Sequence, residues 1–142
     1  MIRSAAEFLR LRTSEDAADQ TRATHEAADD QVWLAVIEQH PDLRKWVAQN
    51  KTVPMSIIGL LLTDEDPVTR SWVARKRKLD RAAFVALSTD ADERVRHALV
   101  TNVKLPPDLL RLLSKDPIDL VAAEAQQRLD QRAATKSQSA MG

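Results

Sequence analysis

The sequence around Trp46 recurs around Trp72, at an interval of 26 residues. The matching residues are Arg44, Trp46, Val47 and Ala48 in the first copy and Arg70, Trp72, Val73 and Ala74 in the second. A third copy follows with Arg96, Ala98 and Leu99. Other columns share the interval: Ile58, Phe84 and Leu110; Leu61, Leu87 and Leu113; Asp64, Asp90 and Asp116. Self-similarity at a fixed interval of this length indicates a tandem array of one supersecondary unit.

The composition and the turn residues indicate that each unit is a pair of short helices. The chain has only two glycines and six prolines, and it has no tyrosine. Proline or aspartate stands where each helix is expected to begin, because proline suits the first helical position and aspartate caps the free backbone donors. First helices are expected to open at Pro54, Asp80 and Pro106, and second helices near Pro67, Asp92 and Pro117. The predicted fold is all-α, a right-handed α-solenoid with a repeat of roughly 26 residues.

Three regions are expected along the chain. Residues 1–40 are predicted to form N-terminal capping helices, beginning at a Ser4–Glu7 capping box. Within them, residues 13–30 lack large apolar side chains and are open to two interpretations, a thin helix or a mobile segment. Helical repeats follow at 41–129, divided at about 41–58, 59–84, 85–110 and 111–129. Residues 130–142 have little to bury and are expected to be a disordered tail.

The 21 basic and 21 acidic residues cancel formally, but they are distributed unevenly along the chain. Residues 1–42 contain nine acids and four bases, whereas residues 43–104 contain seven acids and twelve bases. The chain has no cysteine, which excludes disulfides and thiolate metal sites. No export signal and no membrane-spanning run is apparent, so a cytoplasmic location without membrane attachment is expected.

A resemblance to a known family begins with the third copy. Residues 87–113 contain a leucine, an acidic pair, Val95-Arg96, small apolar residues, Asn102, a proline and the Leu109-Leu110 pair. This run resembles the leucine-rich repeat variant, a bacterial helical repeat similar in shape to HEAT repeats, over about residues 41–129. The resemblance implies an α-solenoid with a binding role and transfers no catalytic residue. Members of that family can carry a cysteine-bound iron–sulfur module, which this chain cannot hold.

Basic residues are the candidate binding site. Arg44, Arg70 and Arg96 recur at the repeat interval, and stacking of the repeats would align them on one face. A basic run, Arg75, Lys76, Arg77 and Lys78, follows the second copy and exceeds what a helix dipole needs at its C-terminus. Two interpretations stay open for the three recurring arginines. They could bind phosphates or an acidic partner, or they could pair with aspartates of the adjacent repeat, such as Asp64, Asp66, Asp90 and Asp92.

The sequence favours a binding function over an enzymatic one. It has no glycine-rich phosphate loop, and the three histidines lie far apart along the chain, so no catalytic residue, metal or cofactor is predicted. A scaffold that binds another protein on its repeat surface is the leading hypothesis. Nucleic-acid or other polyanion binding through the basic middle repeats is the alternative. A helical-repeat DNA-base glycosylase is a third, weakened because no acid is placed in an aromatic pocket.

Overall fold

A computed structural model describes residues 1–141 of the chain. Over this range the protein is all-helical, with ten α-helices and one short 3-10 helix, which confirms the predicted fold class at that level. No strand forms in the described part; one isolated bridge joins Ile2 to Ala28. The chain divides into two compact units, Met1–Val73 (unit 1) and the residues from Ala74 onward (unit 2).

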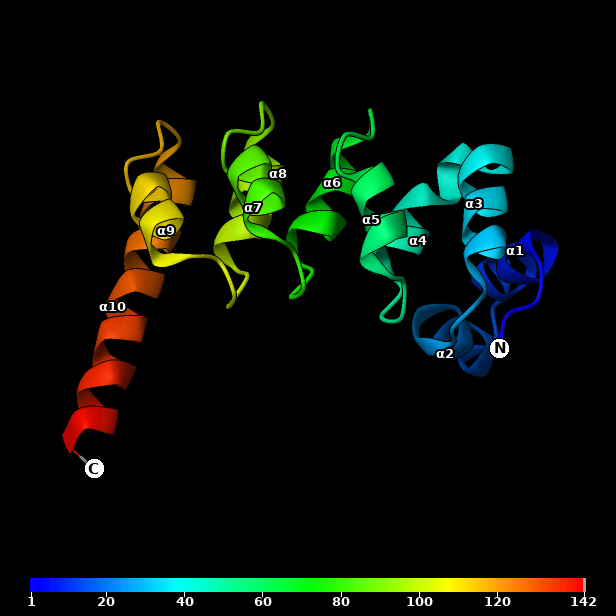
Figure 1. Cartoon of the computed structure of the whole chain (residues 1–142), viewed down its shortest axis with the longest axis horizontal. Helices are drawn as coiled ribbons and strands as arrows, with labels where there is room; N and C mark the ends of the chain where they lie inside the picture. Colours follow the sequence, from blue (N-terminus) through cyan, green and yellow to red (C-terminus); the bar gives the residue numbers. More distant parts are fainter. Residues whose placement is uncertain (142) are drawn as a thin grey trace. The chain divides into compact units, whose positions relative to one another are not determined.

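Unit 1 contains α1 to α5 and all but the last residue of α6 (Figure 1). The elements are α1 (Ala5–Thr13), α2 (Ala17–His25), α3 (Asp30–Gln39), η1 (Pro41–Leu43), α4 (Arg44–Gln49), α5 (Met55–Leu61) and α6 (Pro67–Ala74). The Ser4 hydroxyl caps α1 by accepting from the amide of Glu7 at 3.0 Å, as the capping box predicts.

The core of α1 to α3 is built on two aromatic side chains. Phe8 and Trp33 are both fully buried and meet edge to face, with ring centroids 5.4 Å apart. Residues 17–25 form a helix, so the helical interpretation holds for this part of residues 13–30. The alanine that packs there is Ala23, at 2% exposure, whereas Ala17, Ala18 and Ala27 are exposed. Alanine spacing alone did not show which side of this polar helix faces the core.

Unit 2 contains four helices: α7 (Arg81–Ser88), α8 (Glu93–Val100), α9 (Pro107–Leu113) and α10 (Asp119–Met141). Asp80 and Asp92 cap α7 and α8, with each carboxylate accepting a backbone amide at 2.8 Å. Helix α10 packs against α8 and α9 with its first half, and its second half extends beyond them (Figure 1). Prolines and aspartates therefore begin these helices close to the expected positions.

Most of the predicted apolar columns are buried. Exposure is at most 2% for Leu61, Leu87, Leu113, Val73, Ala98 and Leu99. Trp46 and Trp72, which the repeat places in the same column as Ala98, are only half-buried. The guanidinium of Arg12 lies over the Trp46 ring, 3.7 Å from its centroid, so this indole packs against a cation at the surface of its unit.

The expected disordered tail differs from the structure. Residues 130–141 continue α10 without interruption, and Gly142 lies outside the described residues. Arg132 gives a physical reason, because its guanidinium donates to the carbonyl of Leu105 at 2.7 Å. Leu105 lies 27 residues before Arg132 in the chain. The prediction considered only the lack of apolar residues within the tail, so it could not include this contact.

The buried leucine column predicts a large effect of truncation. Leu87→Ala, at a site with 1% exposure, should lower the free energy of unfolding by about 2–5 kcal/mol through lost burial and a residual cavity. Urea denaturation provides the measurement. Leu112→Ala is the matched control, since Leu112 is 52% exposed and its truncation should cost much less. A loss below about 1 kcal/mol for Leu87→Ala would show that the column is misassigned.

A charged cluster on α1 and α2 predicts how unit 1 responds to acid. Arg22 donates to Glu26 at 2.7 Å and to Glu7 at 2.9 Å. The hydrogen bond from Arg22 is the main cause that lowers the pKa of Glu26 to about 2 from its ordinary 4.5. A lowered folded-state pKa stabilises the fold above the unfolded value, and this contribution is lost as the pH falls from about 4.5 towards 2.

Glu26→Gln should therefore lower the melting temperature at neutral pH and flatten its fall between about pH 5 and pH 2. Thermal melts of the wild type and the variant across this range provide the test. The control is Glu38→Gln on α3, whose side chain is exposed. Parallel pH profiles for wild type and Glu26→Gln would contradict the assignment.

Candidate functional site

The three recurring arginines hold turns of the chain. In unit 1, Arg44 donates to the carbonyl of Ile37 at 2.8 Å and pairs with the Asp64 carboxylate at 3.5 Å. Arg70 donates to the backbone carbonyl of the same Asp64 at 2.7 Å. The structure thus brings Arg44 and Arg70 together around the turn between α5 and α6. The contact of Arg44 with the Asp64 carboxylate is the ion pair that the pairing interpretation expects, whereas the contact of Arg70 is with a backbone carbonyl.

Arg96 does the same in unit 2, between α7 and α8. It donates to the carbonyl of Asp90 at 2.7 Å, and its guanidinium binds both carboxylate oxygens of Asp116 at 2.8 and 3.2 Å. Burial, the largest single influence, raises the pKa of Asp116, but the hydrogen bonds from Arg96 and the Ile118 amide outweigh it and leave the pKa lowered. The side chains are only 13% and 4% exposed, so Arg96 serves the fold with most of its donors engaged.

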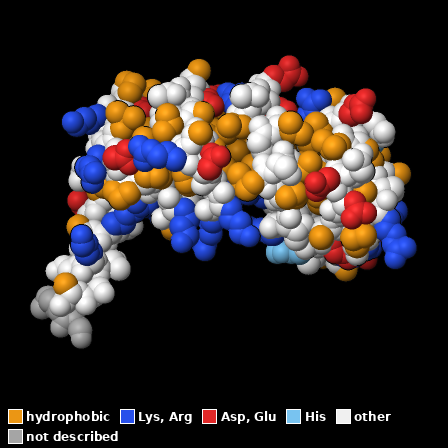
Figure 2. Space-filling model, viewed as in Figure 1, with side chains coloured by type: hydrophobic (Ala, Val, Ile, Leu, Met, Phe, Trp, Pro, Cys, Tyr) orange, Lys and Arg blue, Asp and Glu red, His pale blue; other side chains and the backbone are white. Residues whose placement is uncertain are grey.

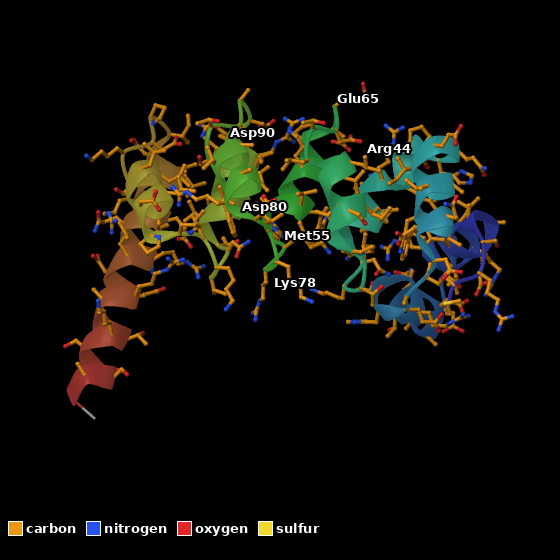
Figure 3. The ribbon with its side chains drawn as sticks, viewed as in Figure 1. Arg44, Met55, Glu65, Lys78, Asp80 and Asp90 are labelled. Atoms are coloured by element: carbon orange, nitrogen blue, oxygen red, sulfur yellow. The ribbon has the colours of Figure 1, made fainter. Side chains whose placement is uncertain are left out.

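The basic run lies in the loop between α6 and α7, at the start of unit 2. Arg75, Arg77 and Lys78 are exposed, and Lys76 is half-buried. Lys78 points away from α7 at the edge opposite Asp90 (Figure 3). Along this edge, beneath α7 and α8, Lys and Arg side chains gather in a row (Figure 2). Arg77 and Lys78 therefore present positive charge to solvent, unlike the largely buried Arg96.

A buried asparagine fixes this loop to the next one. The Asn102 side-chain amide donates to the carbonyls of Ala74 at 2.9 Å and Lys76 at 2.8 Å, and its oxygen accepts from the Lys104 amide at 2.9 Å. Asn102 is 4% exposed, so water has little access to these hydrogen bonds and weakens them little. The α6–α7 loop and the α8–α9 loop are thus held side by side, and the exposed Lys104 joins the same basic edge.

A groove of about 630 Å³ continues from the α8–α9 loop to α10. Its walls include Thr101 and Val103 on the loop and Arg128, Gln131, Arg132 and Lys136 on α10. None of the described residues lining it is acidic. Burial lowers the pKa of Arg132, and the neighbouring charge of Arg128 lowers it further, as expected for a cation bound only to neutral carbonyls.

The α10 cations were not predicted from the sequence, because they lie at or beyond the expected end of the repeats. Arg128, Arg132 and Lys136 recur every four residues, a spacing that places them on one helix face. That regularity was the available signal. We define the basic surface of unit 2 as the loop cations together with the three α10 cations: Arg75, Lys76, Arg77, Lys78, Lys104, Arg128, Arg132 and Lys136.

The arrangement can bind anions by charge and hydrogen bonding. Guanidinium and ammonium groups supply donors for carboxylate or phosphate oxygens. No group of three His, Asp or Glu side chains suited to a metal ion occurs within the described residues. None of the helices in residues 1–141 has the length and apolar character needed to cross a membrane.

Comparisons with known proteins identify no family. No protein-family model, no curated protein and no solved structure matches the chain. The resemblance to the leucine-rich repeat variant therefore stays a prediction.

The asparagine contact yields a prediction for the loop edge. Asn102→Ala removes donors to two carbonyls and an acceptor for one amide, so it should lower the free energy of unfolding by about 1–3 kcal/mol. Hydrogen exchange of the 75–78 amides should also accelerate. Asn50→Ala is the matched comparison, because Asn50 binds the carbonyls of Ala23 and Glu26 in the same way in unit 1. Unchanged exchange in the loop would show that Asn102 does not hold it.

Proposed function

We propose that the chain is a non-enzymatic binding protein, a right-handed α-solenoid of helix pairs that binds another protein through the basic surface of unit 2. Bonds recurring at the sequence interval support the repeat. Arg70 binds the Asp64 carbonyl as Arg96 binds that of Asp90. Asn50 and Asn102, two intervals apart, each join their own loop to an earlier one.

One observation carries the binding proposal: cations gather in the open on unit 2 while other basic residues are engaged in turns. Unit 2 contains thirteen lysines and arginines against nine aspartates and glutamates, whereas unit 1 contains eight against twelve. Arg77, Lys78 and Lys104 are exposed and make no ion pair within the described residues. Exposed charge of one sign attracts a partner of opposite sign and accelerates association.

An acidic protein fits this surface better than single-stranded nucleic acid. Single-strand binders stack bases on aromatic side chains. Unit 2 has one such ring, Phe84, and it is 4% exposed. An exposed apolar side chain, Val103 at 57% exposure, lines the same groove as Arg128 and Lys136 instead. A polypeptide with acidic and apolar residues could use both kinds of contact.

Binding to a defined acidic polypeptide tests the proposal. Wild-type protein should bind poly-glutamate, and Arg77→Glu/Lys78→Glu should weaken that binding by at least about fivefold at low ionic strength, since charge attraction is replaced by repulsion. Fluorescence anisotropy of labelled poly-glutamate gives the dissociation constant. The matched control is Arg111→Glu/Lys115→Glu, two exposed bases of unit 2 outside the basic surface, with an expected change below about twofold.

Two outcomes would contradict the proposal. Failure of the wild type to bind poly-glutamate at low salt would exclude an acidic protein partner. Binding of duplex DNA or RNA together with weak binding of poly-glutamate would favour the polyanion alternative. Circular dichroism of each variant verifies that the helical fold is retained.

A further inference from the structure

The groove between the α8–α9 loop and α10 has features of a peptide site that the charged loop lacks. It is hollow, with a volume of about 630 Å³, whereas Arg77 and Lys78 of the α6–α7 loop are exposed. One wall of the groove carries an apolar side chain, Val103, which is 57% exposed. The other wall is a single face of α10.

That face of α10 is rich in hydrogen-bond donors. Residues 128, 131, 132, 135, 136 and 139 line the groove, a spacing that follows one side of an α-helix. They supply Arg, Gln, Thr, Lys and Ser side chains, and no described acid lines the groove with them. Arg128 is partly neutralised by Glu124 at 3.1 Å, but Lys136 is exposed and makes no ion pair in the described structure.

The Arg132 side chain binds the opposite wall of the groove. Its guanidinium donates to the carbonyl of Leu105 at 2.7 Å and reaches those of Val103 at 3.3 Å and Asn102 at 3.4 Å. These bonds hold the loop against α10 and fix the distance between the apolar wall and the donor wall. Arg132 is therefore a positioning residue, and its positive charge, which no acid in the groove offsets, adds to the potential inside.

We propose that this groove binds an extended acidic peptide segment of a partner protein, with an apolar side chain against Val103 and carboxylates along the α10 face at Arg128 and Lys136. The inference rests on the proposed function and assigns its recognition site. From residue 128 to 139 an α-helix rises about 17 Å, which matches about five residues of extended chain. A peptide of that length could therefore follow the whole donor face.

The probe is an acetylated and amidated peptide, Glu-Asp-Leu-Asp-Glu, titrated into the isotopically labelled full chain. Amide signals of residues 101–103 and 128–140 should shift on binding, and those of 75–78 should shift less. Lys136→Glu should weaken binding by about fivefold or more, because it places repulsion where attraction stood. The matched control Lys115→Glu, an exposed lysine outside the groove, should change it by less than about twofold.

A second peptide tests the apolar contact. Glu-Asp-Ser-Asp-Glu carries the same charge without the leucine side chain, and it should bind about threefold or more weakly because it buries less apolar surface. Equal binding of the two peptides would leave only non-specific charge attraction and would overturn the proposed site.

The remaining outcomes separate this inference from the proposed function. If the wild type binds poly-glutamate but not the peptide, or if the peptide shifts only the 75–78 signals, the groove assignment is wrong and the proposed function stands. If neither acidic probe binds, both fall. If a short single-stranded RNA shifts the groove signals and the peptide does not, the groove binds nucleic acid and the peptide proposal is wrong.

Discussion

The shortness of the helices is the constraint on which the rest of the structure depends. Helices α1 to α9 have between six and ten residues each, and isolated helices below about twelve residues are marginal in water. Their stability must come from packing and from side chains that satisfy the backbone at the turns. Asp64, Asp90 and Asp116 accept backbone amides at these turns, and arginines and asparagines donate to the carbonyls. Many of the polar residues that mark the repeat in the sequence are therefore part of the fold.

The fold was more accessible to sequence reasoning than the site was. Turn chemistry is local, so Asp80 and Asp92 could be identified as caps from their neighbours, and the leucine column followed from its interval. Contacts between distant residues could not be read in this way. The half-burial of Trp46 depends on Arg12, on another helix, and the order of residues 130–141 accompanies bonds from Arg132 to a loop 27 residues earlier. Neither Arg12 nor Arg132 belongs to a column that recurs at the 26-residue interval.

Arginine illustrates why the candidate site was only partly predictable. Arg96 and Arg77 are the same residue type and lie in neighbouring copies of the repeat. Arg96 binds the carboxylate of Asp116, twenty residues later, whereas Arg77 lies in a loop and is exposed to solvent. The interval alone could not separate these roles, because a repeating arginine suits a repeating ion pair as well as a repeating contact with a partner. What separates them in the structure is exposure, together with the Asn102 bonds that present the loop.

Arg132 also bears on how the chain could be lengthened by design. The position one interval after Asn102 is Arg128, which pairs with Glu124, and the loop carbonyls are bound by Arg132 one helical turn later. An engineered extra helix pair would need an asparagine at position 128 and a turn soon after it, in place of continuous helix. That change would displace Arg132 from the carbonyls and remove the donor wall with it. Addition of a further 26-residue copy and retention of the groove are therefore competing design goals for residues 128–141.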